Sequence, residues 1–265
     1  MAKLENKVVI VTGAGRGIGR GMCLALAEEG AKVVVSSRTA SSIEKVVKEI
    51  RSKGGIAEAV VCDVSQKEQV DAMIERSAEL FGKIDVLINN AQSFGTEKDP
   101  MTFSLPKSFE DLPLDEWEWT MRTGLWSTVW GMKAVFPYLK ENGGKIINLA
   151  SPAGVYAAQG ASAYVATKEG VRGLSKVAAR DWGQYKITVN CILPAILTDN
   201  SAGAYEAYMA LQDGDADLEN TANILGYLGD PYKDIGPVAV FLCSSDSDYM
   251  TGHDFSVDGG YYLRP

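Results

Sequence analysis

Histidine is nearly absent from this chain, because His253 is the only one among 265 residues. This argues against a histidine-based catalytic triad and against a metal centre with several histidine ligands, so no metal is expected. The cysteines lie far apart in apolar contexts and form no CxxC pair; they are Cys23, Cys62, Cys191 and Cys243. We expect them to be buried, reduced thiols of a cytoplasmic protein.

Long apolar runs and an excess of positive charge are also lacking. The apolar segments are well short of the roughly 18 residues that cross a bilayer. No charged-then-apolar leader precedes the first strand, so we expect neither a membrane span nor secretion. The 26 Lys and Arg against 34 Asp and Glu give a net charge of −8. That balance disfavours nucleic acid as a partner.

What the chain does have is a regular alternation of short apolar runs with segments of helical periodicity. Strands are expected at about 7–12, 32–37, 58–65, 84–91, 144–151, 187–193 and 254–260. Strands that are apolar on both faces and alternate with helices indicate a parallel sheet covered on both sides. The sequence therefore predicts an α/β fold: one doubly wound domain over residues 1–265, with seven parallel strands.

Two of the expected helices carry local features of interest. The spacing of Ser65 and Glu68 predicts a capping box that opens a helix over 66–82, which Gly82 can end. A second helix is expected from Asp115 to about Leu139, with Gly124 in its middle. Glycine there costs about 1 kcal/mol relative to alanine. Either the helix tolerates a defect, or the chain needs backbone there and no side chain.

A glycine-rich turn follows the first strand. Gly13, Gly15, Gly17 and Gly19 lie between that strand and the first helix. Such a turn lets the backbone approach a pyrophosphate while helix N–H groups point at it. Because it opens the first strand–helix–strand unit, we expect a bound dinucleotide at the carboxyl ends of the strands.

The end of the second strand indicates which dinucleotide this is. A carboxylate there would hold the ribose 2′-hydroxyl of NAD, but this chain has Ser36, Ser37 and Arg38. Arg38 suits a 2′-phosphate, and Arg16 adds a second positive charge, so we expect NADP(H). The alternative for Arg38 is a solvated residue at a helix start. Asp63 is placed to accept a hydrogen bond from adenine, or else to form an Asx turn.

Ser151, Tyr164 and Lys168 have the spacing of a catalytic group. Ser151 ends a strand, and Tyr164 and Lys168 lie one helical turn apart. A tyrosine is a poor base at neutral pH unless an ammonium group stabilises its phenolate. We expect Lys168 to do so, Tyr164 to exchange the proton, and Ser151 to hold the substrate oxygen.

Several motifs together resemble the short-chain dehydrogenase/reductase family over essentially the whole chain. They are TGAGRGIG (12–19), CDV (62–64), NNA (89–91), NLAS (148–151), YVATK (164–168) and VDGG (257–260). The resemblance implies a Rossmann fold, hydride transfer between NAD(P)(H) and an alcohol/carbonyl pair, and a homotetramer or homodimer. It implies Ser151, Tyr164 and Lys168 as catalytic residues. It extends the expected cofactor contacts to Ile18, Val64, Asn90, Ala91, Tyr164, Lys168 and Leu197.

Three positions depart from the family pattern. Gln92 and Ala195 stand where glycine is usual, and Gly124 stands where the family has an asparagine. In the family, the backbone carbonyl of that asparagine holds a water in the proton relay. A glycine keeps this carbonyl, so we expect Gly124→Asn to be tolerated. Together with other features, these departures resemble the bile-acid 12α-hydroxysteroid dehydrogenases of gut bacteria.

Two long segments, 93–116 and 198–232, are expected at the rim, where binding loops and lids occur. The second is rich in tyrosine and leucine, which suits a bulky apolar alcohol or ketone; packing on its own core or on a neighbouring subunit is the alternative. It is also acidic, so a steroid carboxylate would face solvent, Lys98, Lys107 or Arg264. A reductase of smaller ketones, 3-oxoacyl thioesters or sugars, and a non-catalytic NADP-binding regulator, stay open.

Overall fold

A computed structural model describes residues 2–101, 106–196, 198, 223–227 and 229–263. The central sheet is formed by β1 (Val8–Thr12), β2 (Lys32–Ser37), β3 (Ile56–Val61), β4 (Val86–Asn89), β7 (Gly144–Leu149), β8 (Ile187–Pro194) and β9 (Asp254–Val257). These seven strands are all parallel, in the order β3-β2-β1-β4-β7-β8-β9. The doubly wound α/β fold predicted from the alternation is confirmed.

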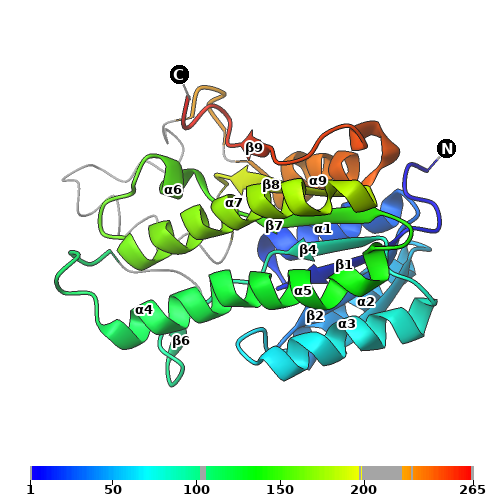
Figure 1. The fold of residues 1–265 in the computed structure, drawn as a ribbon, viewed down its shortest axis with the longest axis horizontal. Helices are drawn as coiled ribbons and strands as arrows, with labels where there is room; N and C mark the ends of the chain where they lie inside the picture. The colour runs from blue at the N-terminus through cyan, green and yellow to red at the C-terminus, as the bar shows by residue number, and fades with distance from the viewer. Residues whose placement is uncertain (1, 102–105, 197, 199–222, 228, 264–265) are drawn as a thin grey trace.

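Helices cover both faces of the sheet (Figure 1). They are α1 (Gly17–Glu28), α2 (Ala40–Ser52), α3 (Lys67–Phe81), α4 (Leu114–Met121), α5 (Ser127–Leu139), α6 (Pro152–Val155), α7 (Ser162–Trp182) and α9 (Gly236–Cys243). One layer contains α1, α2 and α9, and the other contains α3, α5 and α7. Because the strands are apolar on both faces, the sheet packs against helices on each side.

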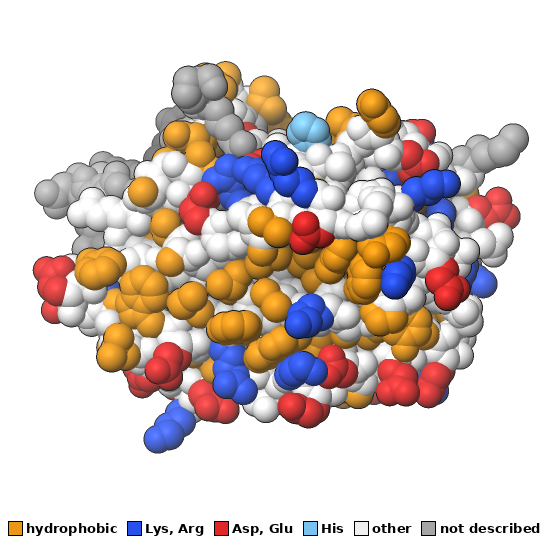
Figure 2. Space-filling model, viewed as in Figure 1, with side chains coloured by type: hydrophobic (Ala, Val, Ile, Leu, Met, Phe, Trp, Pro, Cys, Tyr) orange, Lys and Arg blue, Asp and Glu red, His pale blue; other side chains and the backbone are white. Residues whose placement is uncertain are grey.

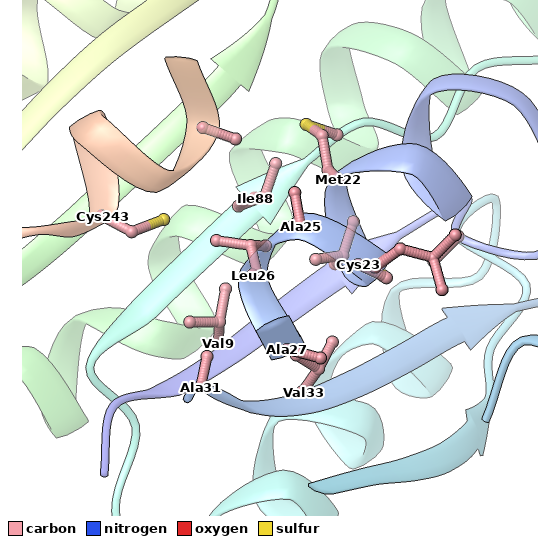
Figure 3. Close-up of a cluster of buried hydrophobic side chains, with 14 of the residues drawn as sticks. Val9, Met22, Cys23, Ala25, Leu26, Ala27, Ala31, Val33, Ile88 and Cys243 are labelled. Atoms are coloured by element: carbon pink, nitrogen blue, oxygen red, sulfur yellow. The ribbon is translucent and has the colours of Figure 1, made fainter. Parts of the chain in front are cut away.

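Alternate residues of one strand supply the two apolar layers. In β1, Val9 and Val11 belong to the layer of α1 and α9, whereas Ile10 belongs to the layer of α3 and α5. Figure 3 shows part of the first layer, including Val9 from β1, Leu26 from α1 and Cys243 from α9. This two-residue period buries β1 completely.

The order of the sheet changes direction between β1 and β4, which are neighbours although Thr12 and Val86 are 74 positions apart in the chain. Chain segments leave these two strands on opposite sides, so their carboxyl ends diverge. A crevice at such a point is where ligands of doubly wound sheets bind. The glycine turn after β1 and the loop after β4 both lie there.

The structure corrects two local expectations. The predicted capping box is wrong: α3 begins after Gln66, and no side chain of the described residues caps it. The N–H of Ser65 instead donates to Asp63 Oδ1 at 2.9 Å. Gly82 does end the helix, with φ +77°. The segment predicted as a loop over 93–116 contains a small antiparallel pair, β5 (Phe94–Gly95) with β6 (Pro100–Met101), and the start of α4.

The helix predicted around Gly124 is present but is not regular. Between α4 and α5 the hydrogen bonds shift to a π-helical turn, Arg122–Trp126, which we call the π turn. Gly124 lies at its centre and is buried. Single π turns inside α-helices occur frequently at functional sites.

Candidate functional site

The glycine turn sits at the carboxyl edge of the sheet between β1 and α1. Gly13 has φ +64°, in the left-handed region that favours glycine. A β-carbon on Gly15 would lie 2.3 Å from Ser42 Oγ, and one on Gly19 would lie 2.5 Å from the carbonyl oxygen of Gly13. In the described part of the chain no side chain caps α1, which begins at Gly17, so its first N–H groups are available to an anion.

Asn90, which directly follows the neighbouring strand β4, holds this turn by hydrogen bonds. Its Nδ2 donates to the carbonyl oxygens of Thr12 at 2.8 Å and of Gly13 at 3.2 Å. Its backbone N–H donates to Thr12 Oγ1 at 3.0 Å. The side-chain amide of Asn90 is thus used to fix the glycine turn across the crevice between β1 and β4.

Two arginines face the cavity near the end of β2. Arg16 and Arg38 are exposed and line the cavity, and within the described part of the chain neither makes an ion pair. By contrast, Arg20 on α1 forms an ion pair with Glu49, with 2.7 Å between Nη2 and Oε2. Ser36 is fully buried and does not line the cavity, so of the two serines only Ser37 offers a hydroxyl there.

Asp63 lies on the cavity wall and also forms the Asx turn that was its alternative role. Its Oδ1 accepts the N–H of Ser65, and its own N–H donates to Gln69 Oε1 at 2.9 Å. The carboxylate is therefore held at the end of β3 by local hydrogen bonds. Val64 lines the same wall.

Ser151, Tyr164 and Lys168 are brought together by β7, α6 and α7. Ser151 caps α6, where its Oγ accepts the N–H of Ala153 at 3.2 Å. Lys168 is 5% exposed, and its Nζ donates to the carbonyl oxygen of Leu149 at 2.8 Å. The same Nζ lies 5.6 Å from the centre of the Tyr164 ring. All three side chains of the group line one cavity.

Burial shifts the pKa values of this pair in opposite directions. Desolvation lowers the pKa of Lys168 to about 8. Desolvation raises the pKa of Tyr164, and the hydrogen bond with Ser151 opposes that rise. The expectation that Lys168 holds the phenol pKa down stays a prediction. Burial alone favours neutral Tyr164, because each charged form loses solvation.

The cavity has a volume of about 760 Å³ and joins the glycine turn to Ser151, Tyr164 and Lys168. Of the sequence-predicted site residues, those on its wall are Gly13, Gly15, Arg16, Ile18, Gly19, Ser37, Arg38, Asp63, Val64, Asn90, Ala91, Ser151, Tyr164 and Lys168. Gly17 is not on the wall, and Leu197 lies outside the described residues. A groove with a glycine turn, a helix start and exposed arginines fits a dinucleotide.

Sequence reasoning missed several apolar members of the wall. Phe94 packs on Tyr164 with ring centres 5.2 Å apart, and Tyr156 packs on Tyr261 at 6.0 Å. Pro106 and Ile196 also line the cavity. These residues come from segments far apart in the chain and carry no motif. Only their aromatic or apolar character beyond the strand ends could have indicated them.

The lysines considered for a substrate carboxylate are not free at the cavity. Lys107 is paired with Glu116, and both side chains are partly exposed. Lys98 is exposed and does not line the cavity, and Arg264 lies outside the described residues. The described cations on the cavity wall are Arg16, Arg38 and Lys168.

The fold and this cavity define a class of protein, the oxidoreductases that use a nicotinamide cofactor. The sequence model of a family described as enoyl-(acyl carrier protein) reductase matches residues 13–262. The chain belongs to the short-chain dehydrogenase/reductase family, and it acts on alcohol or ketone groups.

Relatives and a solved structure agree with this assignment. The chain is 35% identical to the 12alpha-hydroxysteroid dehydrogenase of a Clostridium species, over the full length of both chains. It is 36% identical to a 3-oxoacyl-(acyl-carrier-protein) reductase of Staphylococcus epidermidis, over 97% of this chain and 100% of the relative. A short-chain type dehydrogenase/reductase from Mycobacterium marinum superposes with a TM-score of 0.86 at 30% identity, covering 99% and 98% of the two chains.

Proposed function

We propose that this protein is an NADP(H)-dependent dehydrogenase of a secondary alcohol, and that the alcohol is a bile acid with a 12α-hydroxyl group. One observation carries the proposal. Ser151, Tyr164 and Lys168 meet on the wall of the same cavity that has the glycine turn at its other end. The catalytic roles of Ser151, Tyr164 and Lys168 belong to this proposal.

When bound, the nicotinamide supplies or accepts the hydride. Tyr164 donates a proton to the ketone oxygen in reduction and removes the hydroxyl proton in oxidation. Ser151 donates a hydrogen bond to the same substrate oxygen. Lys168, held by the carbonyl of Leu149, places a positive charge beside Tyr164 and stabilises its phenolate in the oxidation direction.

The preference for NADP(H) is supported by Arg16 and Arg38. Both are free of ion-pair partners among the described residues and both line the cavity. No carboxylate follows β2 to repel a 2′-phosphate, since the strand ends in Ser37 and is followed by Arg38. A guanidinium group binds phosphate through two parallel hydrogen bonds.

The steroid substrate is supported by the apolar wall and by one relative. Phe94, Tyr156 and Tyr261 give the substrate end aromatic surface, and the Clostridium relative carries the name of a 12alpha-hydroxysteroid dehydrogenase. Because Lys107 is paired with Glu116, we propose that the carboxylate of the bile acid faces solvent. We also propose that 198–232 is a substrate lid in a single domain; its residues 199–222 and 228 lie outside the described ones.

A reductase of 3-oxoacyl thioesters is the second candidate, because the Staphylococcus relative is equally similar. Smaller ketones and sugars belong to the same alternative. Oxidation of cholate, deoxycholate and chenodeoxycholate with NADP⁺ separates the two. Turnover of the first two only supports a 12α-hydroxyl, whereas turnover of none removes the steroid substrate. Tight NADPH binding without turnover of any alcohol or ketone would indicate a regulator.

We further propose a cytoplasmic homo-oligomer, a homotetramer or homodimer. Figure 2 shows an apolar band over α4, α5 and α7 on the face towards the viewer. Exposed apolar side chains on or beside these elements include Trp126, Tyr138 and Val177, of which Val177 is 59% exposed. Contiguous apolar surface of this kind is typical of protein interfaces. No helix among the described residues is long and apolar enough to span a membrane.

A further inference from the structure

The segment that follows β9 returns to the cavity wall with two consecutive tyrosines. Tyr261 lines the cavity, and its ring centre lies 6.0 Å from that of Tyr156, with an angle of 58° between the rings. Tyr262 packs on the same ring at 5.7 Å but does not line the cavity. In Figure 1 this segment and α6 lie on the same side of the molecule. The two tyrosines thus share one aromatic partner, and only the first of them meets the ligand space.

Tyr156 connects this aromatic group to Ser151. Ser151 caps the start of α6, and Tyr156 directly follows the last residue of that helix. The N–H of Tyr156 donates to the carbonyl oxygen of Pro152 at 3.1 Å, so its backbone continues the helical turn. Four helical residues rise only about 6 Å. Tyr156 is therefore about one helical turn away from the hydroxyl that holds the substrate oxygen in the proposed function.

Hydrogen bonds also fix the backbone of Tyr261. Its N–H donates to the carbonyl oxygen of Asp258 at 2.9 Å, and the N–H of Gly260 donates to Asp258 Oδ1 at 3.0 Å. The N–H of Leu225 donates to the carbonyl oxygen of Gly259 at 3.2 Å, which holds the same turn from another segment. Tyr261 is thus the first residue after a closed turn. A ring held in this way loses little conformational entropy when a ligand packs on it.

Tyr261 differs in this respect from Phe94. The Phe94 ring packs on Tyr164 itself, with 5.2 Å between the ring centres, so every substrate held by Tyr164 lies near it. Among the described residues, Tyr261 makes neither a ring contact nor a hydrogen bond with Ser151 or Tyr164; its ring partner is Tyr156. The substrates that reach Tyr261 are therefore those that extend past the reacting carbon.

We propose that Tyr261, with Tyr156 as its positioning residue, determines the specificity for bulky ring substrates: its ring offers a flat apolar face to the part of the substrate remote from the reacting carbon. Aromatic side chains present large apolar surfaces, of which a compact alcohol can cover only a small part. The inference rests on the proposed function and names the residue that favours a fused-ring alcohol over a small one.

Tyr261→Ala removes the ring, and two alcohols report the result: deoxycholate, with fused rings, and cyclohexanol, with one ring. We expect kcat/KM for deoxycholate with NADP⁺ to fall about tenfold, mostly through a higher KM, because the lost contact serves the ground state and the transition state alike. For cyclohexanol, kcat/KM should stay within about twofold, and so should the affinity for NADPH in fluorescence titration. An equal loss for both alcohols, no loss for deoxycholate, or a tenfold loss of NADPH affinity would overturn the proposal.

Tyr262→Ala is the matched control. It takes a ring away from the same partner, Tyr156, without removing any of the cavity wall. Its kcat/KM should stay within about twofold of the wild type for both alcohols. If Tyr262→Ala changed the ratio of the two alcohols as strongly as Tyr261→Ala, the effect would come from the packing of the segment, and the proposal would fall.

Tyr261→Phe separates the ring from its hydroxyl. Phenylalanine keeps the flat apolar face, so this variant should retain the preference of the wild type for deoxycholate. A loss as large as that of Tyr261→Ala would assign the specificity to the hydroxyl and overturn the role of the apolar face.

The positioning role of Tyr156 is tested by Tyr156→Ala, alone and combined with Tyr261→Ala. If Tyr156 acts through Tyr261, the double variant loses little more for deoxycholate than the more impaired single variant. Tyr156→Phe, which keeps the ring contact, should behave like the wild type. Additive losses in the double variant would make the two rings independent and overturn the positioning role.

Failure of the proposed function is measured on the wild type, and failure of the inference on the variants. If the wild type oxidises cyclohexanol but no bile acid, the steroid substrate fails; 4-cyclohexylcyclohexanol, which adds one ring to cyclohexanol, then replaces deoxycholate in the same comparison. If the wild type oxidises deoxycholate but not cyclohexanol, the contrast between Tyr261→Ala and Tyr262→Ala on deoxycholate decides. If it oxidises none of the three alcohols, both proposals fall. If the wild type oxidises deoxycholate and Tyr261→Ala matches it, the inference alone fails.

Discussion

The two ends of the cavity are built in opposite ways. At the cofactor end, space is made by leaving side chains out: a β-carbon on Gly19 would clash with backbone, and the charged Arg38 is exposed. At the other end, the catalytic end of the proposed function, side chains are packed in: Ser151 is 6% and Lys168 is 5% exposed. The cofactor end should therefore be sensitive to added atoms and the catalytic end to lost polar groups. Four experiments test this contrast.

Tyr164→Phe removes one hydroxyl from the catalytic end of the cavity and should have the largest effect on activity. The loss of a general acid–base group costs about 10²–10⁴-fold in kcat. The affinity for NADPH should stay close to that of the wild type, since the ring and its contact with Phe94 remain. Steady-state kinetics and fluorescence titration measure the two quantities. Tyr249→Phe, at a fully exposed tyrosine, is the matched control. Appreciable turnover by Tyr164→Phe would assign the proton to another group.

Lys168 should give the cofactor-free protein an unusual pH dependence of stability. Its pKa is about 8 in the folded protein, below the ordinary lysine value of 10.5. Between pH 8 and 10.5 the unfolded state binds a proton that the folded state has lost, so stability rises with pH. The difference in free energy of unfolding between the wild type and Lys168→Met, measured by chemical denaturation at each pH, should rise by about 3 kcal/mol over this range. A flat difference would mean that the ammonium group is not desolvated.

Arg38→Asp tests the role of positive charge at the cofactor end of the cavity. A hydrogen bond to a charged group contributes about 1.5–3 kcal/mol, so kcat/KM for NADP⁺ should fall about 10- to 100-fold relative to that for NAD⁺. Because Arg38 is exposed and unpaired among the described residues, the fold should be unaffected. The same charge change in Arg76→Asp, on α3 and away from the cavity, should leave the ratio alone. An unchanged ratio in Arg38→Asp would refute the preference for NADP(H).

A pair of glycine substitutions gives the smallest effects. Gly19→Ala places a β-carbon 2.5 Å from the carbonyl oxygen of Gly13 and should destabilise the fold by about 1–3 kcal/mol. Gly173 lies in α7, and a β-carbon added there would meet no described atom within 4 Å. Gly173→Ala should therefore stabilise the protein by about 1 kcal/mol through helix propensity. Thermal unfolding compares the two. Equal destabilisation by both would contradict the crowding of the glycine turn.

The parts of this molecule that follow from local pattern could be predicted. Apolar runs and helical periodicity were enough for the parallel sheet, and the sheet then places the segments after β1, β4 and β7 at one edge. Tyr164 and Lys168 share one helix, so their spacing alone brings them together.

What could not be predicted depends on contacts between distant segments. Gln92 and Gly124 are 32 positions apart, and nothing in either segment shows that one side chain fills the space of the other. The π turn is a local change of backbone hydrogen bonding, which the apolar spacing of the segment does not reveal. The expected capping box failed because Asp63 competes for the N–H of Ser65.

The four thiols offer a use that has nothing to do with catalysis. Each is buried, on a different element or loop, and burial raises the pKa of Cys62 and Cys243 to about 12. Because the thiolate is the reactive form and Cys23, Cys191 and Cys243 do not line the cavity, a labelling reagent can reach these three only when the surrounding structure opens. Cys23 reports on α1, Cys191 on β8 and Cys243 on α9. The native protein thus carries its own set of probes for the order in which its layers come apart.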